Sequence, residues 1–208
     1  MFYFVKMPGF FKVLYPGCIW SIDNKEKVLY LTFDDGPHPE ITPFVLDQLK
    51  KFNAHATFFC IGNNVVAHPE IYKQILSEGH TTGNHTYNHT NAWKVKDEIF
   101  LQDVEDAAKV INSSLFRPPY GKITHFQIRQ LARPRFLLKP VMWDVISGDF
   151  DQGISSVQCL NNVLLNAGQG SIVVFHDSEK AFNHLRYSLP LTLMHFYNKG
   201  YSFESIRL

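Results

Sequence analysis

The sequence predicts an α/β protein, a single-domain, distorted (β/α) barrel with about seven strands. Short β-prone apolar runs alternate with segments whose apolar residues recur at helical spacing, a pattern typical of a parallel sheet covered by helices. Residues 1–208 contain no repeat, low-complexity tract or linker, and the chain has the size of one domain. Up to seven strands fit the pattern, which favours an incomplete or distorted barrel over an open sheet.

Continuous apolar runs locate the strands. Residues 28–33 form the first run, which stops at Asp34-Asp35-Gly36-Pro37 and is therefore typical of a buried strand that ends in a loop. The other strands are expected at residues 56–61, near 115–116, within 137–145, at 171–175 and at 201–206.

Apolar residues three and four positions apart locate the helices. Residues 42–52 show this spacing, and Pro43 suits the first turn of a helix. Gly79 is placed to end a helix over residues 69–78. The remaining helices are expected at residues 97–112, 124–132, 155–166 and 189–198.

Composition excludes several classes of protein. Hydrophobic residues make up 45% of the chain and charged residues 19%, which argues against a disordered chain or a coiled coil. The net charge of +1 argues against a nucleic-acid partner. Cys18, Cys60 and Cys159 form no CxxC motif, so neither a disulfide framework nor a cysteine-based zinc site is expected.

The start of the chain is apolar and rich in aromatic residues, but it is interrupted. A cleavable signal peptide needs an uninterrupted apolar run, and here Lys6, Pro8 and Gly9 interrupt it. We expect residues 1–25 to pack across the domain; contact with a membrane surface is the alternative. No run approaches the roughly 18 apolar residues of a membrane helix. The expected location is therefore cytoplasmic or membrane-peripheral, and the expected state is a monomer.

Polar residues gather where the apolar strands end. In a β/α barrel the carboxyl ends of the strands share one face, and that face carries the active site. The clusters predict a single site built from these residues: Asp34-Asp35, Arg117 to Tyr120, Asp149, and His176-Asp177.

A pair of histidines lies four positions apart at His85 and His89. On a helical turn, two imidazoles at this spacing share one face and can bind one metal ion. Such a pair alone is weak support for a metal site. A carboxylate from Asp34-Asp35, however, completes a His/His/Asp set that suits zinc, cobalt or another divalent ion. The second carboxylate is then left beside the metal as a general base. The alternative is that Asp34-Asp35-Gly36-Pro37 is a simple turn.

Five motifs resemble those of the polysaccharide deacetylase family, also called carbohydrate esterase family four. They span residues 32 to 177 in the order of the family: Thr32-Phe33-Asp34-Asp35-Gly36-Pro37, His85-Thr86-Tyr87-Asn88-His89, Arg117-Pro118-Pro119-Tyr120-Gly121, Trp143 to Phe150, and Ile172 to Asp177. The fold that this resemblance implies is a distorted β/α barrel, in agreement with the strand pattern.

The resemblance implies a role for each matching residue. Asp35, His85 and His89 would hold one divalent metal ion, with zinc expected first and cobalt, nickel or manganese as alternatives. Asp34 would be the general base that activates the attacking water. His176 would be the general acid that protonates the leaving amine, which departs poorly without a proton.

Further roles are implied around these groups. Arg117 would orient Asp34, Asp149 would tune His176, and the backbone N–H of Tyr120 would stabilise the oxyanion. The residues expected to line the substrate site are Pro118, Tyr120, Trp143 and Phe150. The chain departs from the family at Phe150, where tryptophan is usual, and at Ile146, where many members carry an acidic residue; both bear on the tuning of the acid and on the substrate range.

The resemblance implies a metal-dependent hydrolase that removes acetyl groups from N-acetylglucosamine units of an oligo- or polysaccharide, of the chitooligosaccharide or peptidoglycan type. Three alternatives remain at this point: an O-acetyl xylan esterase, a hydrolase of a non-sugar amide, and an inactive carbohydrate-binding module. The presence of both Asp34 and His176 counts against the inactive module.

Overall fold

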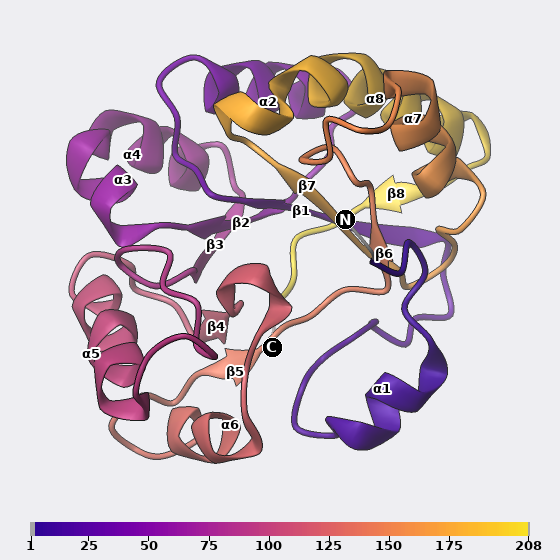
Figure 1. Cartoon of the computed structure of the whole chain (residues 1–208). Coiled ribbons are helices and arrows are strands. Elements are labelled where there is room, and N and C mark those ends of the chain that lie inside the picture. The colour runs from indigo at the N-terminus through magenta and orange to yellow at the C-terminus, as the bar shows by residue number, and fades with distance from the viewer. Residues whose placement is uncertain (1–2, 208) are drawn as a thin grey trace.

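A computed structural model describes residues 3–207, and a curled parallel sheet forms its centre (Figure 1). Within those residues, seven strands follow one another in the order β5-β4-β3-β2-β1-β7-β6, and β8 pairs with the start of β1. Their bounds are β1 Val28–Asp34, β2 Thr57–Cys60, β3 Thr81–Asn84, β4 Leu115–Phe116, β5 Lys139–Pro140, β6 Val145–Ile146, β7 Ile172–His176 and β8 Ser202–Phe203. The prediction of a distorted (β/α) barrel with about seven strands is confirmed.

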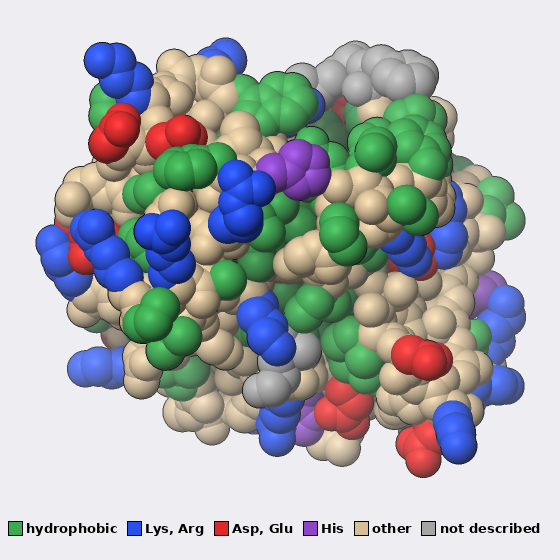
Figure 2. All heavy atoms as spheres, turned by 90° about the horizontal axis from the view of Figure 1, so that it is seen from below, with side chains coloured by type: hydrophobic (Ala, Val, Ile, Leu, Met, Phe, Trp, Pro, Cys, Tyr) green, Lys and Arg blue, Asp and Glu red, His purple; other side chains and the backbone are tan. Residues whose placement is uncertain are grey.

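Helices surround the sheet (Figure 1). Helices α2 (Ile41–Lys50), α7 (Ser156–Leu164) and α8 (Glu179–Asn198) lie on the side of β1, β6 and β7. The helices on the other side are α3 (Gly62–Ala67), α4 (Pro69–Ser77), α5 (Asp97–Ala108) and α6 (His125–Leu131). In the view from below, Lys and Arg side chains are interspersed with apolar and acidic ones (Figure 2).

The central strand β1 explains where the polar groups meet. All seven of its residues are buried, and the ring of Phe33 stacks between those of Phe58 and Phe175 at centroid distances of 5.1 and 6.0 Å. Apolar packing therefore fixes the strand, and its last residue, Asp34, emerges at the carboxyl end of the sheet. The register of β1 with β7 places Asp34 directly beside His176.

Residues 3–25, here called the N-terminal strap, pair with both open edges of the curled sheet. Lys6 forms an antiparallel bridge to Val145 of the edge strand β6, and Ile19 forms a parallel bridge to Val141, which follows β5. Helix α1 (Gly9–Leu14) lies between these two contacts. Pairing of this kind covers backbone groups that an edge strand would otherwise expose.

Several elements differ from the sequence-based expectation. Strand β3 was not predicted, because its sequence Thr-Thr-Gly-Asn carries no apolar run. Residues 137–145 hold β5 and the start of β6 rather than one strand. Helix α8 begins at Glu179, not near residue 189, and contains Pro190. Its buried face includes His184 and Ser188, which hide the apolar spacing.

None of the helices in residues 3–207 combines the length and apolar character that crossing a membrane requires.

Candidate active site

Three predicted metal ligands come together at the carboxyl ends of β1 and β3. The Oδ1 atom of Asp35 lies 3.8 Å from Nε2 of His85 and 3.3 Å from Nε2 of His89. One ligand atom from each residue lies within 4.8 Å of the others. The prediction from the histidine spacing and the neighbouring carboxylate therefore corresponds to a real cluster that can hold a metal ion.

The chemistry of this cluster fits a divalent cation. The Oδ1 atom of Asp35 is buried and has no hydrogen-bond partner in the protein, an arrangement that costs free energy unless a cation or water satisfies it. The Nδ1 atom of His85 donates to the carbonyl oxygen of Arg117 at 2.7 Å, which leaves the lone pair of Nε2 free to bind. Burial lowers the pKa of His85 to about 4, so its imidazole is neutral at pH 7, as a metal ligand must be.

The loop that carries the two histidines is not a helical turn, so that part of the sequence-based expectation is wrong. Residues 85–89 follow β3, and Thr86 and His89 have positive φ angles of 64° and 58°. The side-chain oxygen of Asn84 accepts the N–H of Thr86 at 2.8 Å, and the hydroxyl of Thr86 accepts the N–H of Thr90 at 3.1 Å. These side-chain bonds replace the helical ladder and still direct both imidazoles to one point.

Asp103 of α5 stabilises the same loop through hydrogen bonds, a role that the sequence did not predict. Its carboxylate accepts the side-chain N–H of Asn88 at 2.6 Å, and its carbonyl oxygen accepts the N–H of Tyr87 at 3.1 Å. Asp103 is buried. A buried carboxylate needs partners, so an acidic residue on the apolar face of a predicted helix is the signal that could have revealed it.

Asp34 is paired with Arg117, as predicted. Nη1 of Arg117 donates to Oδ1 of Asp34 at 2.7 Å, and both side chains are buried. The guanidinium lies 4.0 Å from the centroid of the Phe59 ring. Its other bonds go to three acceptors: the hydroxyl of Thr32 (2.7 Å), the carbonyl of Met142 (2.9 Å) and the carbonyl of Val141 (3.1 Å). Each of its three nitrogens thus donates at least one bond, and the guanidinium holds one oxygen of Asp34 in place.

His176 is paired with Asp149, also as predicted. The Nδ1 atom of His176 lies 2.7 Å from Oδ1 of Asp149, and the second carboxylate oxygen accepts the backbone N–H of His176 at 2.7 Å. Burial alone disfavours the imidazolium, but the negative charge of Asp149, reinforced by Asp35 and Asp34, raises the pKa of His176 to about 10. His176 therefore carries a proton at neutral pH.

Asp177 holds the turn that directly follows Asp34 and Asp35. Its Oδ1 accepts the N–H of Gly36 at 3.0 Å, and its Oδ2 accepts the hydroxyl of Thr42. A Cβ atom on residue 36 would lie 2.1 Å from the Asp177 carboxylate, so only glycine fits there. Burial raises the pKa of Asp177 to about 7.

The four predicted substrate-lining residues differ in their placement. Tyr120 is exposed, has a positive φ of 61°, and its ring lies 4.7 Å from that of His89. The ring of Phe150 meets that of His176 edge-on at 5.2 Å. Trp143 is half-buried, and its indole nitrogen has no protein partner. Pro118 is buried and offers a substrate little surface.

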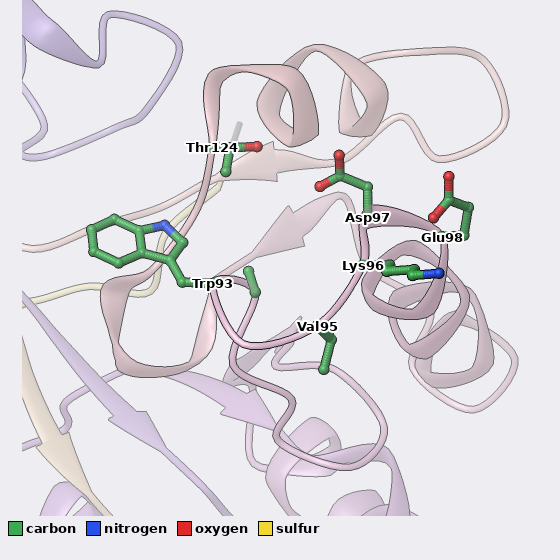
Figure 3. Close-up of a pocket in the computed structure, with 7 residues that line it drawn as sticks. Trp93, Val95, Lys96, Asp97, Glu98 and Thr124 are labelled. Atoms are coloured by element: carbon green, nitrogen blue, oxygen red, sulfur yellow. The ribbon is translucent and has the colours of Figure 1, made fainter.

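A surface hollow of about 610 Å³ is lined by residues of the loop before α5, by the start of α5 and by Thr124 (Figure 3). Trp93 lies four residues after His89, is 58% exposed, and has the ammonium group of Lys122 at 4.3 Å from its ring centroid. Figure 3 shows the indole on its loop, apart from Asp97 and Glu98 at the start of α5. The loops of Trp93 and Lys122 also carry His89 and Tyr120, so the hollow adjoins the site.

Comparison with known proteins points to one family. A family model described as polysaccharide deacetylase matches residues 21–133. A peptidoglycan-N-acetylglucosamine deacetylase of Bacillus cereus is 36% identical over 193 residues, which cover 90% of this chain and 90% of that protein. A second protein of that name from the same organism is 39% identical over 161 residues, and here the alignment covers 74% of this chain but only 57% of the relative. A chitooligosaccharide deacetylase of Azorhizobium caulinodans is 35% identical over 163 residues, 75% of this chain and 76% of that protein.

Solved structures agree with the fold. The crystal structure of the Bc1960 peptidoglycan N-acetylglucosamine deacetylase superposes with a TM-score of 0.86 at 32% identity, over 96% of this chain and 95% of that one. A wild-type pseudoenzyme of carbohydrate esterase family four from Bacillus anthracis superposes with a TM-score of 0.78 at 23% identity, over 91% of this chain and 67% of that one. At that identity the second likeness concerns the fold alone.

Proposed function

The chain belongs to the polysaccharide deacetylase family, and from this premise we propose that it is a metal-dependent hydrolase of N-acetylated glycans. It would remove acetyl groups from N-acetylglucosamine units of the peptidoglycan or chitooligosaccharide type and release acetate. One observation carries the proposal: the Asp35, His85 and His89 cluster occurs together with a neighbouring carboxylate held by Arg117 and an imidazole held by Asp149.

The metal-ligand cluster supplies the first requirement of amide hydrolysis. Asp35, His85 and His89 would hold a divalent ion, which would supply Lewis acidity to activate a water molecule and polarise the carbonyl group. Two imidazoles and one carboxylate are donors that zinc prefers, so we propose zinc, with cobalt, nickel or manganese as alternatives.

Asp34 is suited to take the proton from the attacking water. The Arg117 guanidinium holds one of its oxygens and leaves the other available beside the cluster. A base so fixed needs no reorganisation when the proton moves.

His176 is suited to deliver a proton to the leaving amine, since its pKa of about 10 keeps it charged at neutral pH. Asp149 fixes the proton-bearing Nδ1, which leaves Nε2 to face the reacting group. Tyr120, at its left-handed φ, is proposed to direct its backbone N–H to the oxyanion, a contribution of roughly 3–4 kcal/mol in comparable sites.

The pH dependence tests the role of Asp149. Because His176 has a raised pKa, its proton is present at low and neutral pH and is lost as the pH rises through about 10. Asp149→Asn removes the charge that raises this pKa, so the alkaline limb of kcat/KM should move to lower pH by about one unit or more. A pH–rate profile of both proteins checks this. An alkaline limb that stays in place would exclude His176 as the group that titrates there.

The hollow beside the site favours an extended glycan over a single sugar. We propose that a sugar ring two or more units from the reacting one packs on Trp93, whose exposed indole offers the apolar face that sugar rings use. Trp93→Ala should raise KM for long oligomers about three- to tenfold and leave kcat and the shortest oligomer unchanged. Steady-state kinetics on a series of chain lengths measures this. Tyr187→Ala, which removes a partly exposed aromatic ring on α8, is the control, and an equal rise in KM there would contradict the proposal.

Substrate choice is decided by acetate release from a panel: N-acetylglucosamine oligomers, peptidoglycan and acetylated xylan. Release from the first two, with free amines appearing in equal amount, would support the proposal. Release from xylan alone would indicate an O-acetyl esterase. No release from any substrate, with metal bound, would indicate the inactive module or a non-sugar amide.

A further inference from the structure

The N-terminal strap reaches the proposed acid through an edge of the sheet. The N–H of Ile146 donates to the carbonyl of Val5 at 2.9 Å, and Lys6 forms its antiparallel bridge with Val145. If the same antiparallel register is extended by three residues toward the N-terminus, Tyr3 lies opposite Gly148. The contact is close: a Cβ atom on residue 148 would lie 2.5 Å from the hydroxyl oxygen of Tyr3. The glycine therefore makes room for the tyrosine.

Two ring contacts then connect Tyr3 to the imidazole. The rings of Tyr3 and Phe150 lie 5.3 Å apart at an interplanar angle of 54°. The ring of Phe150 meets that of His176 at 5.2 Å and 73°, an edge-to-face arrangement. Phe150 has no polar atom, so it holds the imidazole by packing alone.

The hydroxyl of Tyr3 is fixed at the far end of this row. It is partly buried next to the carboxylate of Asp151, and both effects raise its pKa to about 12, so it remains a donor across the working pH range. Lys180 of α8 lies 5.9 Å from the centroid of the Phe150 ring and limits its movement on another side. Phe150 is thus enclosed by three groups, of which only Tyr3 comes from the strap.

We propose that Tyr3 is a positioning residue for His176 and acts through Phe150, so that the N-terminal strap forms part of the catalytic apparatus. Asp149 fixes one nitrogen of His176 but leaves the ring free to rock about that bond. Edge-on contact with Phe150 removes this freedom, and Tyr3 keeps Phe150 in place. The proposal rests on the proposed role of His176 as the acid.

The test is a double-mutant cycle in the full chain. Tyr3→Ala should lower kcat about three- to tenfold with KM unchanged, the size expected for one aromatic pair. Phe150→Leu should cause a similar loss. In the Phe150→Leu background, Tyr3→Ala should cost almost nothing further, because the connecting ring is gone. Tyr3→Phe, which keeps the ring, should retain most of the wild-type kcat.

A control and an independent signal complete the test. Tyr15 belongs to the same strap but stacks on His125 at 4.7 Å, so Tyr15→Ala should leave kcat unchanged. NMR of the His176 imidazole in metal-free protein should show exchange broadening in Tyr3→Ala and not in Tyr15→Ala. This signal does not depend on turnover, so it separates a failure of this proposal from a failure of the proposed activity. Equal losses from Tyr3→Ala in both backgrounds, or an unchanged imidazole signal, would overturn the proposal.

Discussion

Asp34→Asn is expected to reduce acetate release by about 10²–10⁴-fold, the range typical of a lost general base. An amide cannot take the proton from water, while its oxygen can still accept the bond from Arg117. The ligands Asp35, His85 and His89 are untouched, so zinc binding measured by calorimetry should persist. This variant is therefore expected to lose turnover and to keep its affinity for the metal.

A matched variant controls for the loss of one negative charge. Asp47 of α2 forms an exposed pair with Lys51, which directly follows the helix, and Asp47→Asn should leave acetate release at the wild-type level. Thermal unfolding of both variants shows whether the fold is kept. An Asp34→Asn protein that retains a large part of its activity would transfer the role of base to another group.

Arg117→Met is expected to have the largest effect on stability, a loss of about 3–5 kcal/mol in the free energy of unfolding. The substitution removes the partner of Asp34, which is itself buried, and leaves an unpaired charge in the core. It also removes the donor that the hydroxyl of Thr32 and the carbonyls of Val141 and Met142 accept from. Urea denaturation monitored by circular dichroism measures the change.

The chain provides its own comparison in Arg135. This residue forms an ion pair with Glu105 on the surface, where solvent screens the interaction. Arg135→Met should shift the urea midpoint very little. If the two arginine variants lost equal free energy of unfolding, burial of the Arg117–Asp34 pair would not explain its contribution to stability.

Much of this fold is predictable because its central strands are apolar runs. The continuous apolar run at residues 28–33 is typical of a strand buried on both faces, and the strand observed is Val28–Asp34. Strand β3 was not predicted because pairing with β2 and β4 stabilises it, whereas its own composition does not favour a strand. The residues that line the site were predicted from their position after such strands and from the family resemblance.

The remaining parts of the site depend on contacts between distant segments. Thr32 looks like an ordinary strand residue, yet its hydroxyl accepts from Arg117, 85 positions further along the chain. The loop at residues 85–89 adopts two left-handed residues because Asn84 and Asp103 bind its backbone, which periodicity does not reveal. Tyr3 approaches His176 only through the pairing of the strap with β6.

The most direct test of the account is a metal titration of the chelator-stripped protein. Acetate release from N-acetylglucosamine oligomers should be absent after stripping, return as zinc is added, and reach its maximum at one equivalent per chain. A His89→Gln variant should bind zinc weakly and recover little activity over the same range. Full activity in the stripped protein, or a maximum independent of Asp35, His85 and His89, would contradict the central claim.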